Sequence, residues 1–225
     1  MKILGIVFLI LFCTAAAVHL FDSGRDSKRR GITKPMLLVF LLIWYLFAAK
    51  DAGKEWKVWL IAAIATSWLG DVLLMPKGNK WFVIGGISFL ISHLLFIAVY
   101  VPQVDFAAVN LWVIIPVAFV YGLISFSVMY AVRKNTPKPM FAPMLLYLAA
   151  NSAMNLFALM QFMTLKNVWA AVAYAGAVLF FTSDCTLFLV RYHENKDLIF
   201  KKHFTVMFTY IAGEFLITLG ILFLT

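Results

Sequence analysis

Three carboxylic acids and one histidine stand inside long apolar stretches of this sequence: Asp71, Asp184, Glu214 and His93. An ionisable side chain in lipid costs several kcal/mol unless it is paired or neutral, so these four residues are the first candidates for a functional role. Carboxyl groups in such surroundings are well suited to donating or accepting a proton. The pattern therefore indicates acid–base chemistry inside an apolar environment.

The two aspartates occupy similar depths. Asp71 stands about 6 Å of helix rise from Met75, where its apolar run ends, and Asp184 stands about 10 Å from Arg191. The ordinary interpretation of one such residue is an interfacial carboxylate that reaches water or pairs with lysine. Both, however, adjoin small residues that allow close helix contact, namely Ser67 and Gly70 for the first and Thr182 and Ser183 for the second.

Two acids at one depth favour a shared polar site. Desolvation and the nearby like charge disfavour ionisation of both, so one aspartic acid is expected to keep its proton and act as a general acid. The other, as an anion, can stabilise a cation and orient water, which is how paired carboxylates divide their roles in glycoside hydrolysis. Either residue can take either role.

A second polar layer is expected deeper in the chain's apolar segments. His93 and Glu214 lie about 16 to 18 Å of helix rise from the starts of their runs, near a membrane midplane. His93 is either a core histidine bonded across helices or a partner of Glu214. Tyr147, Asn151 and Asn155 share one face of another run, where asparagines act as interhelical hydrogen-bonding groups or as substrate contacts.

The composition indicates that these residues lie in a membrane protein. Of the 225 residues 64% are hydrophobic and 13% charged, against about 45–50% and 25% in soluble proteins. A soluble domain is therefore excluded. The net charge of +9 comes from bases in short loops between apolar runs, which are topology signals and give no reason to expect a nucleic acid partner. Cys13 and Cys185 show no disulfide or metal-ligand spacing, so no metal and no cofactor is expected.

Only helices satisfy the backbone of such runs in lipid. The sequence predicts an all-α membrane protein, a compact bundle of about eight transmembrane helices in one domain over residues 1–225, with a short second span. The predicted spans are 3–21, 35–49, 58–75, 81–101, 111–132, 140–165, 168–190 and 203–224.

Lys and Arg are unevenly divided between the two sides of this topology. Five stand on the side of the amino terminus and fourteen on the other, so the basic loops are predicted to be cytoplasmic and both termini to lie outside. The motif 67–71 is echoed by 181–184, and each ends in aspartate at the close of its helix. The echo admits a parallel duplication, four helices followed by four, as one arrangement.

Four dispersed motifs resemble the YhhN-like membrane proteins, a family that includes the lysoplasmalogenases. Glu214 stands where the family pattern has Gln, and Phe96 where it has Tyr. The matching motifs are Ser67-x-x-Gly70-Asp71, Gly86-x-x-Phe89-x-x-x-His93, Gly176-Ala177-x-Leu179-Phe180-x-x-Ser183-Asp184 and Tyr210-x-x-x-Glu214-x-Leu216-Ile217.

The resemblance implies a membrane-embedded hydrolase that cleaves the vinyl ether bond of lysoplasmalogens, releasing a fatty aldehyde and a glycerophospho-base. Asp71 and Asp184 are then the expected catalytic residues, in a bacterial cytoplasmic membrane, and basic residues such as Arg191 or Lys77 are candidates for holding the phosphate. The expected partners are the lysophospholipid substrate and the bilayer, and the oligomeric state is unknown. The expected substrate-binding residues are Ser67, His93, Asn151, Asn155, Ser183, Tyr210 and Glu214.

Two other functions use buried acids. A transporter or lipid-binding protein with a carboxylate proton relay is the main alternative, because buried acids and parallel repeats are frequent in transporters. An intramembrane aspartyl protease is disfavoured: Trp68 occupies the first glycine position of its Gly-x-Gly-Asp signature, and no Tyr-Asp pair is present.

Overall fold

The computed structural model describes residues 3–24, 29–49 and 56–224, and within them every regular element is helical. The all-α prediction is confirmed, and the helix ends agree with the predicted spans within a few residues except at the second span. The elements are α1 (Ile3–Asp22), α2 (Arg30–Ala48), α3 (Trp56–Leu73), α4 (Asn79–Tyr100), the short 3-10 helix η1 (Val101–Gln103), α5 (Leu111–Val132), α6 (Lys138–Leu165), α7 (Val168–Tyr192) and α8 (His203–Phe223).

The prediction of a short second span is wrong. Helix α2 begins at Arg30 and continues through Pro35, which gives it 19 residues. Because a span counted from apolar residues stops where polar ones begin, the prediction omitted the polar first turns of α2 up to Lys34. Those turns carry side chains that matter for the site.

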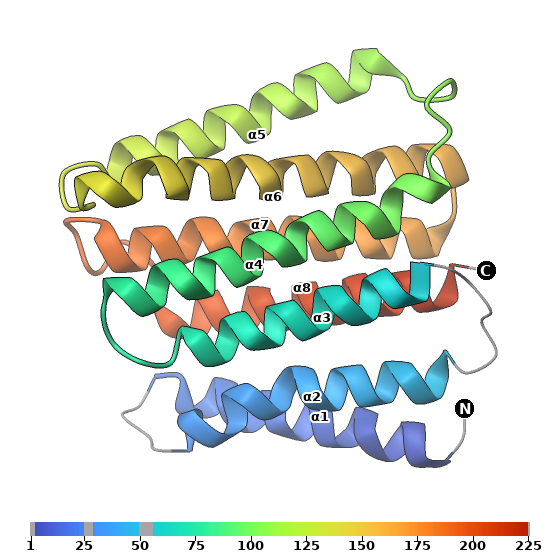
Figure 1. Ribbon diagram of the computed structural model, residues 1–225, viewed down its shortest axis with the longest axis horizontal. Helices are drawn as coiled ribbons and strands as arrows, with labels where there is room; N and C mark the ends of the chain where they lie inside the picture. The colour runs from blue at the N-terminus through green and yellow to red at the C-terminus, as the bar shows by residue number, and fades with distance from the viewer. Residues whose placement is uncertain (1–2, 25–28, 50–55, 225) are drawn as a thin grey trace. The chain divides into compact units, whose positions relative to one another are not determined.

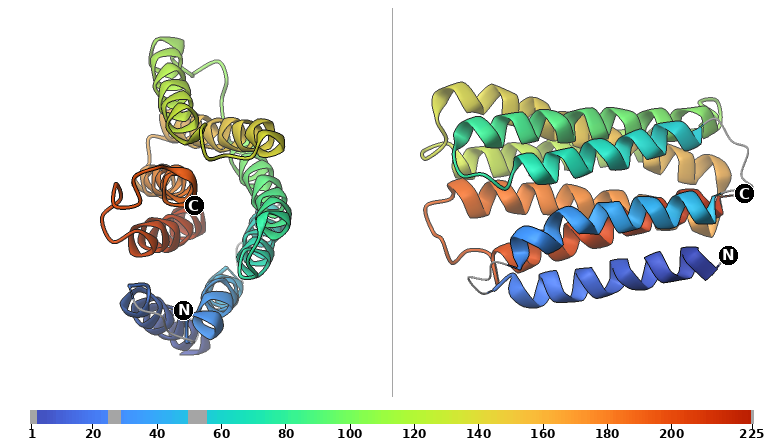
Figure 2. Two further views of the ribbon diagram at one scale, coloured as in Figure 1. Left: turned by 90° about the vertical axis from the view of Figure 1, so that its left-hand side faces the viewer. Right: turned by 60° about the horizontal axis from the view of Figure 1, so that its bottom comes forward.

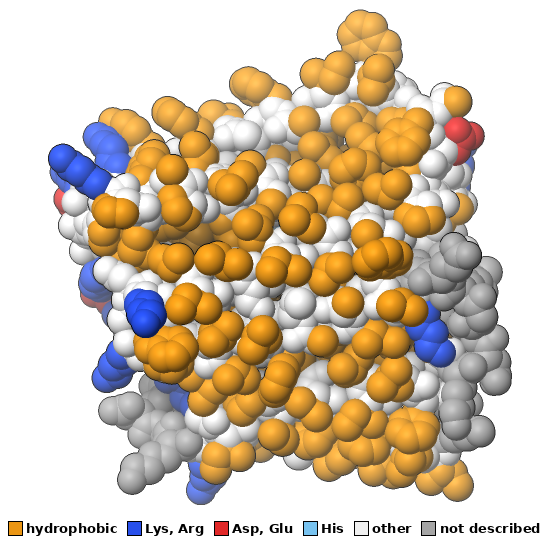
Figure 3. All heavy atoms as spheres, viewed as in Figure 1, with side chains coloured by type: hydrophobic (Ala, Val, Ile, Leu, Met, Phe, Trp, Pro, Cys, Tyr) orange, Lys and Arg blue, Asp and Glu red, His pale blue; other side chains and the backbone are white. Residues whose placement is uncertain are grey.

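Seven of the helices in the described ranges are long and apolar enough to cross a membrane. The chain is therefore a multi-pass membrane protein. Helix α3 is not among the seven; it has 18 residues and contains Lys57 and Asp71. Hydrophobic side chains cover the face shown in Figure 3, and Lys and Arg lie toward the helix ends. Large hydrophobic side chains lie on the surface, as at Trp112, which is 88% exposed. Loop sidedness stays a prediction.

The helices group into two compact units, Met1–Val99 and Tyr100–Leu224. In the first unit α2 packs against both α1 and α3 (Figure 1). Two serines join α4 to α3: Ser88 Oγ donates to the Thr66 carbonyl at 2.7 Å and Ser92 Oγ to the Ala63 carbonyl at 3.0 Å. The single domain over residues 1–225 and the parallel repeat stay predictions.

In the second unit α7 has its most extensive contact with α8, and α5, α6 and α7 pack against one another (Figure 2). Asn110 and Asn167 cap α5 and α7 by accepting the backbone N–H two residues later. Helix α6 ends at Leu165, and the next residue, Lys166, has a left-handed φ of 48°. Only Lys166 and Asn167 separate α6 from α7. This short connection makes the two helices an antiparallel pair.

Glycine brings the backbones of α7 and α8 into direct contact. A Cβ atom on Gly176 would lie 2.6 Å from the Ile217 backbone nitrogen and 2.8 Å from the Gly213 carbonyl oxygen. Gly220 is equally close to the backbone of Ala173. Small residues that allow such an approach are a principal means of helix association in lipid.

Replacing Gly176 by alanine should therefore destabilise the second unit, by about 1–3 kcal/mol, because the extra methyl group forces backbone to move. The matched control is Gly122→Ala in α5, where a Cβ atom meets nothing within 4 Å. Thermal unfolding in detergent, followed by tryptophan fluorescence, should give a lower midpoint for Gly176→Ala only. Equal midpoints for the two variants would contradict the close packing.

Candidate active site

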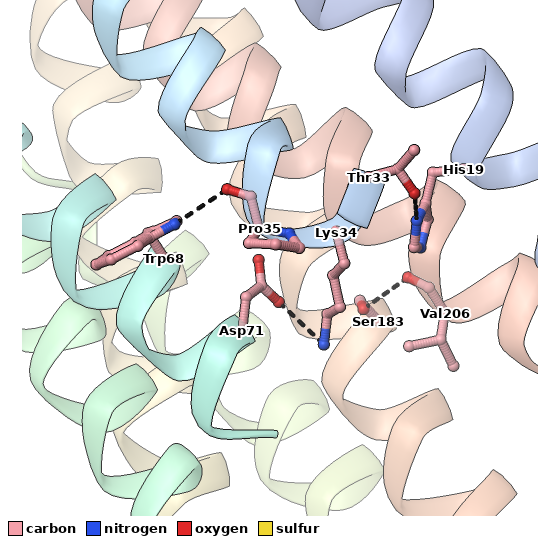
Figure 4. Close-up of polar contacts among 8 residues, drawn as sticks. All are labelled: His19, Thr33, Lys34, Pro35, Trp68, Asp71, Ser183 and Val206. Carbon is pink, nitrogen blue, oxygen red and sulfur yellow. Dashed lines mark hydrogen bonds and ion pairs between the residues drawn. The ribbon is translucent and has the colours of Figure 1, made fainter. Parts of the chain in front are cut away.

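Asp71 lies on the last full turn of α3, where it forms an ion pair with Lys34 of α2. The Lys34 Nζ atom is 3.3 Å from Asp71 Oδ1, and the two side chains are 18% and 3% exposed (Figure 4). The sequence allowed Asp71 either to reach water or to pair with a lysine. The structure shows the pair with lysine. An ammonium group at this distance favours the carboxylate over the carboxylic acid.

Neighbouring contacts fix the positions of α2 and α4 around this ion pair. The Trp68 Nε1–H donates to the Pro35 carbonyl at 3.0 Å, which joins α3 to α2 (Figure 4). On the other side of α3, Ser67 Oγ lies 2.6 Å from Ser92 Oγ of α4. Gly70 faces Phe89, whose ring would be 2.6 Å from an added Cβ. Ser67 therefore serves helix packing beside the acid.

Asp184, on α7, has different surroundings. Its Oδ2 atom accepts hydrogen bonds from the Tyr147 hydroxyl at 2.8 Å and from the Asn151 Nδ2 group at 2.7 Å. Both donors belong to α6 and lie one turn apart on its face toward α7. Asp184, Tyr147 and Asn151 are all buried. The two donors fix the orientation of the carboxyl group.

The hydrogen-bond chain continues away from Asp184 to α5. Asn155 Nδ2 donates to Asn151 Oδ1 at 3.0 Å, and the Tyr121 hydroxyl donates to Asn155 Oδ1 at 3.0 Å. Every donor in the chain is directed toward Asp184. Asn151 and Asn155, predicted to contact the substrate, are thus hydrogen-bonded to protein groups. The sequence did not single out Tyr121, because no spacing on one helix relates it to Asn155.

The other predicted site residues of the second unit lie on α7 and α8. Ser183 Oγ donates to the Val206 carbonyl at 2.9 Å and so joins these helices (Figure 4). The buried Tyr210 ring packs edge-on against Phe180, with 5.4 Å between centroids. Glu214 is completely buried, within electrostatic range of the hydroxyls of Tyr100 and Tyr147.

His93 is completely buried on α4, in the first unit. Its pairing with Glu214 would join the two units, as would a site shared by Asp71 and Asp184. Both pairings stay predictions. Within the described ranges, no group of three or more His, Cys, Asp or Glu residues is placed to hold a metal ion.

The sequence model of the YhhN family matches residues 30–221, which span both aspartates and the donors to Asp184. The chain belongs to the YhhN family. Proteins of Mycobacterium bovis and Mycobacterium tuberculosis, each named lysoplasmalogenase, are 31% identical to it over 220 residues. Each alignment covers 95% of this chain and 79% of the relative. No solved structure matches. The family resemblance of the four sequence motifs is therefore confirmed.

Lys34→Met should destabilise this YhhN protein strongly, because the buried Asp71 carboxylate loses its ammonium partner; breaking such a pair costs about 3–5 kcal/mol. Lys134→Met is the control. Lys134 pairs with Glu194 at 3.2 Å on the surface, and an exposed pair contributes at most about 1 kcal/mol.

Thermal unfolding in detergent measures both changes. The double variant Lys34→Met/Asp71→Leu should recover much of the lost stability, since it removes the buried charge together with its partner. If Lys34→Met unfolds at the wild-type midpoint, the ion pair does not stabilise α2 against α3.

Proposed function

We propose that this chain is a lysoplasmalogenase that hydrolyses the vinyl ether bond of a lysoplasmalogen in the bacterial cytoplasmic membrane. The observation that carries the proposal is the similarity over 95% of the chain to two proteins of that name. The buried carboxyl groups of Asp71 and Asp184, each held by named partners on a second helix, support it.

The two carboxyl groups have different partners, and this suggests their roles. Asp71 faces the ammonium group of Lys34, so it serves as the anion. Asp184 accepts two neutral donors, both on Oδ2, so its proton resides on Oδ1 when the group is a carboxylic acid. Asp184 is then the general acid, and Tyr147 and Asn151 orient Oδ1 toward the substrate.

The reaction requires one acid, one water molecule and stabilisation of one cation. The acid transfers its proton to the β-carbon of the enol ether, and the double-bond electrons form the new C–H bond. The resulting oxocarbenium ion is stabilised by the Asp71 carboxylate, as in glycoside hydrolysis. Water adds to the cationic carbon and returns a proton to Asp184. The hemiacetal then collapses to the fatty aldehyde and the glycerophospho-base.

The position of the acids suits the substrate. The vinyl ether of a lysolipid lies just below its head group, which is the depth predicted for both aspartates. The alkenyl chain extends toward the deeper layer, where we place His93 and Glu214 beside it. Tyr210 and Ser183 hold α7 against α8, and these two helices carry Asp184 and Glu214.

Asp71→Asn and Asp184→Asn should each lower turnover by about 10²- to 10⁴-fold, because general acid–base catalysis contributes that much. The control is Asp105→Asn, at an exposed loop residue. Aldehyde release from a vinyl ether lysolipid by purified protein in detergent is the measurement. A folded variant at either buried position that keeps more than about a tenth of wild-type turnover eliminates the role given to that residue.

In D₂O the aldehyde should carry one deuterium on the carbon next to the carbonyl group, because protonation of the enol ether creates that C–H bond. An acid acting from one face should deliver it stereospecifically. Mass spectrometry and NMR of the aldehyde, trapped at once as an oxime, test this. Aldehyde without deuterium at that carbon would exclude carbon protonation, and failure to form any aldehyde would favour a transporter with a carboxylate relay.

A further inference from the structure

His19 and Arg30 bring two buried polar atoms to the same end of the α1–α2 pair in the first unit. His19 is in the last turn of α1 and is 1% exposed, and Arg30 is the first residue of α2. The His19 Nδ1 atom lies 2.8 Å from Thr33 Oγ1 (Figure 4). The other imidazole nitrogen, Nε2, and the Arg30 Nε atom are buried, and neither has a hydrogen-bond partner in the described part of the chain.

These two atoms have opposite polarity. Thr33 Oγ1 donates its hydrogen to the Arg29 carbonyl at 3.1 Å, so it accepts the Nδ1–H of His19. A neutral imidazole with its hydrogen on Nδ1 presents a lone pair at Nε2. Arg30 Nε–H is a charged donor. A buried donor and a buried acceptor that lack partners each destabilise the protein. A bound ligand with both an acceptor and a donor would give each atom a hydrogen-bond partner.

The surroundings limit the chemistry of that ligand. The charges of Lys34, Arg30 and Asp22 all act on His19. Lys34 lies 3.3 Å from Asp71, so its charge is compensated. Arg30 is the cation that an incoming anion would meet, and the buried Asp22 carboxylate keeps such an anion on the Arg30 side of His19. Lys34 follows Arg30 by one turn of α2, about 6 Å along the helix axis, so Arg30 stands at the end of α2 that carries the ion pair between Lys34 and Asp71.

We propose that Arg30 and His19 recognise the head group of a lysophospholipid, with Arg30 donating to a phosphate oxygen and His19 Nε2 accepting the hydrogen of the neighbouring free hydroxyl. This site rests on the proposed function, because it serves the lipid on which Asp71 acts. In a lysoplasmalogen the vinyl ether, the hydroxyl and the phosphate ester occupy three successive carbons of glycerol. Arg30 and Lys34 stand one helical turn apart, and Lys34 contacts Asp71, so the proposed phosphate group and the ether would be held from neighbouring turns of α2.

The site gives a physical reason for the choice of a lysolipid over a lipid with two chains. Acylation of the hydroxyl removes the hydrogen that His19 accepts and leaves Nε2 buried without a partner. Sites that bond a substrate hydroxyl discriminate strongly against analogues lacking it.

The test is equilibrium binding to purified full-length protein in detergent, with saturated ether lipids that cannot be cleaved. Three probes are compared: 1-O-alkyl-lysophosphatidylethanolamine, its 2-O-methyl ether, and 1-O-alkylglycerol, which has no phosphate. Arg30→Gln should weaken binding of the first probe by about tenfold or more, the effect of one hydrogen bond to a charged group, and leave 1-O-alkylglycerol unchanged. His19→Asn keeps the donor to Thr33 and removes Nε2, so it should abolish the preference for the free hydroxyl over the methyl ether.

Arg133→Gln is the matched control, since Arg133 is an exposed arginine that bonds its own helix at Tyr130, and it should change none of the three affinities. The site is overturned if Arg30→Gln weakens all three probes equally, or none, or if His19→Asn keeps the preference for the free hydroxyl. Displacement of the lysolipid by millimolar inorganic phosphate would overturn the head-group assignment in favour of free phosphate. Because no probe is cleaved, the expected pattern in a protein that releases no aldehyde would support the site and reject the proposed activity.

Discussion

A polar group inside an apolar helical protein must find its partner in the protein, because lipid offers none. Each acid of the candidate site meets this requirement across two helices. Asp71 on α3 is held by Lys34 on α2, and Asp184 on α7 is held by Tyr147 and Asn151 on α6. The same contacts that lower the cost of burial therefore also fix which helices stand next to each other. Packing and chemistry depend on one set of bonds.

The two solutions differ in kind. A charged partner such as Lys34 suits an aspartate that stays ionised, whereas Asp184 accepts from two neutral donors on one oxygen, Oδ2. Two carboxyl groups of the same chemical type thus acquire different proposed roles from their neighbours. Nothing in the local sequence around either aspartate shows this difference, since each follows small residues near the close of an apolar helix.

Helix number and, except at the start of α2, helix ends are predictable because lipid requires a minimum length of apolar helix and an internally hydrogen-bonded backbone. The face shared by Tyr147, Asn151 and Asn155 was predictable for a related reason, as it follows from spacing along one helix. Contacts between helices had no such signal. Lys34 precedes the predicted span 35–49, so the sequence places it in a basic loop, and its contact with Asp71 depends on how α2 packs. Tyr121 joins Asn155 across α5 and α6 for the same reason.

The two-residue connection between α6 and α7 has a consequence for how this protein can change over evolution. Asn151 and Asp184 both stand about four helical turns from that connection, on antiparallel helices that leave it with no slack. One residue inserted in α7 between the connection and Asp184 would turn Asp184 by about 100° about the helix axis and carry it away from its donors. Surface loops in most proteins tolerate changes of length. Here the number of residues from Asn151 to the Lys166–Asn167 connection and from there to Asp184 sets the alignment of the two side chains.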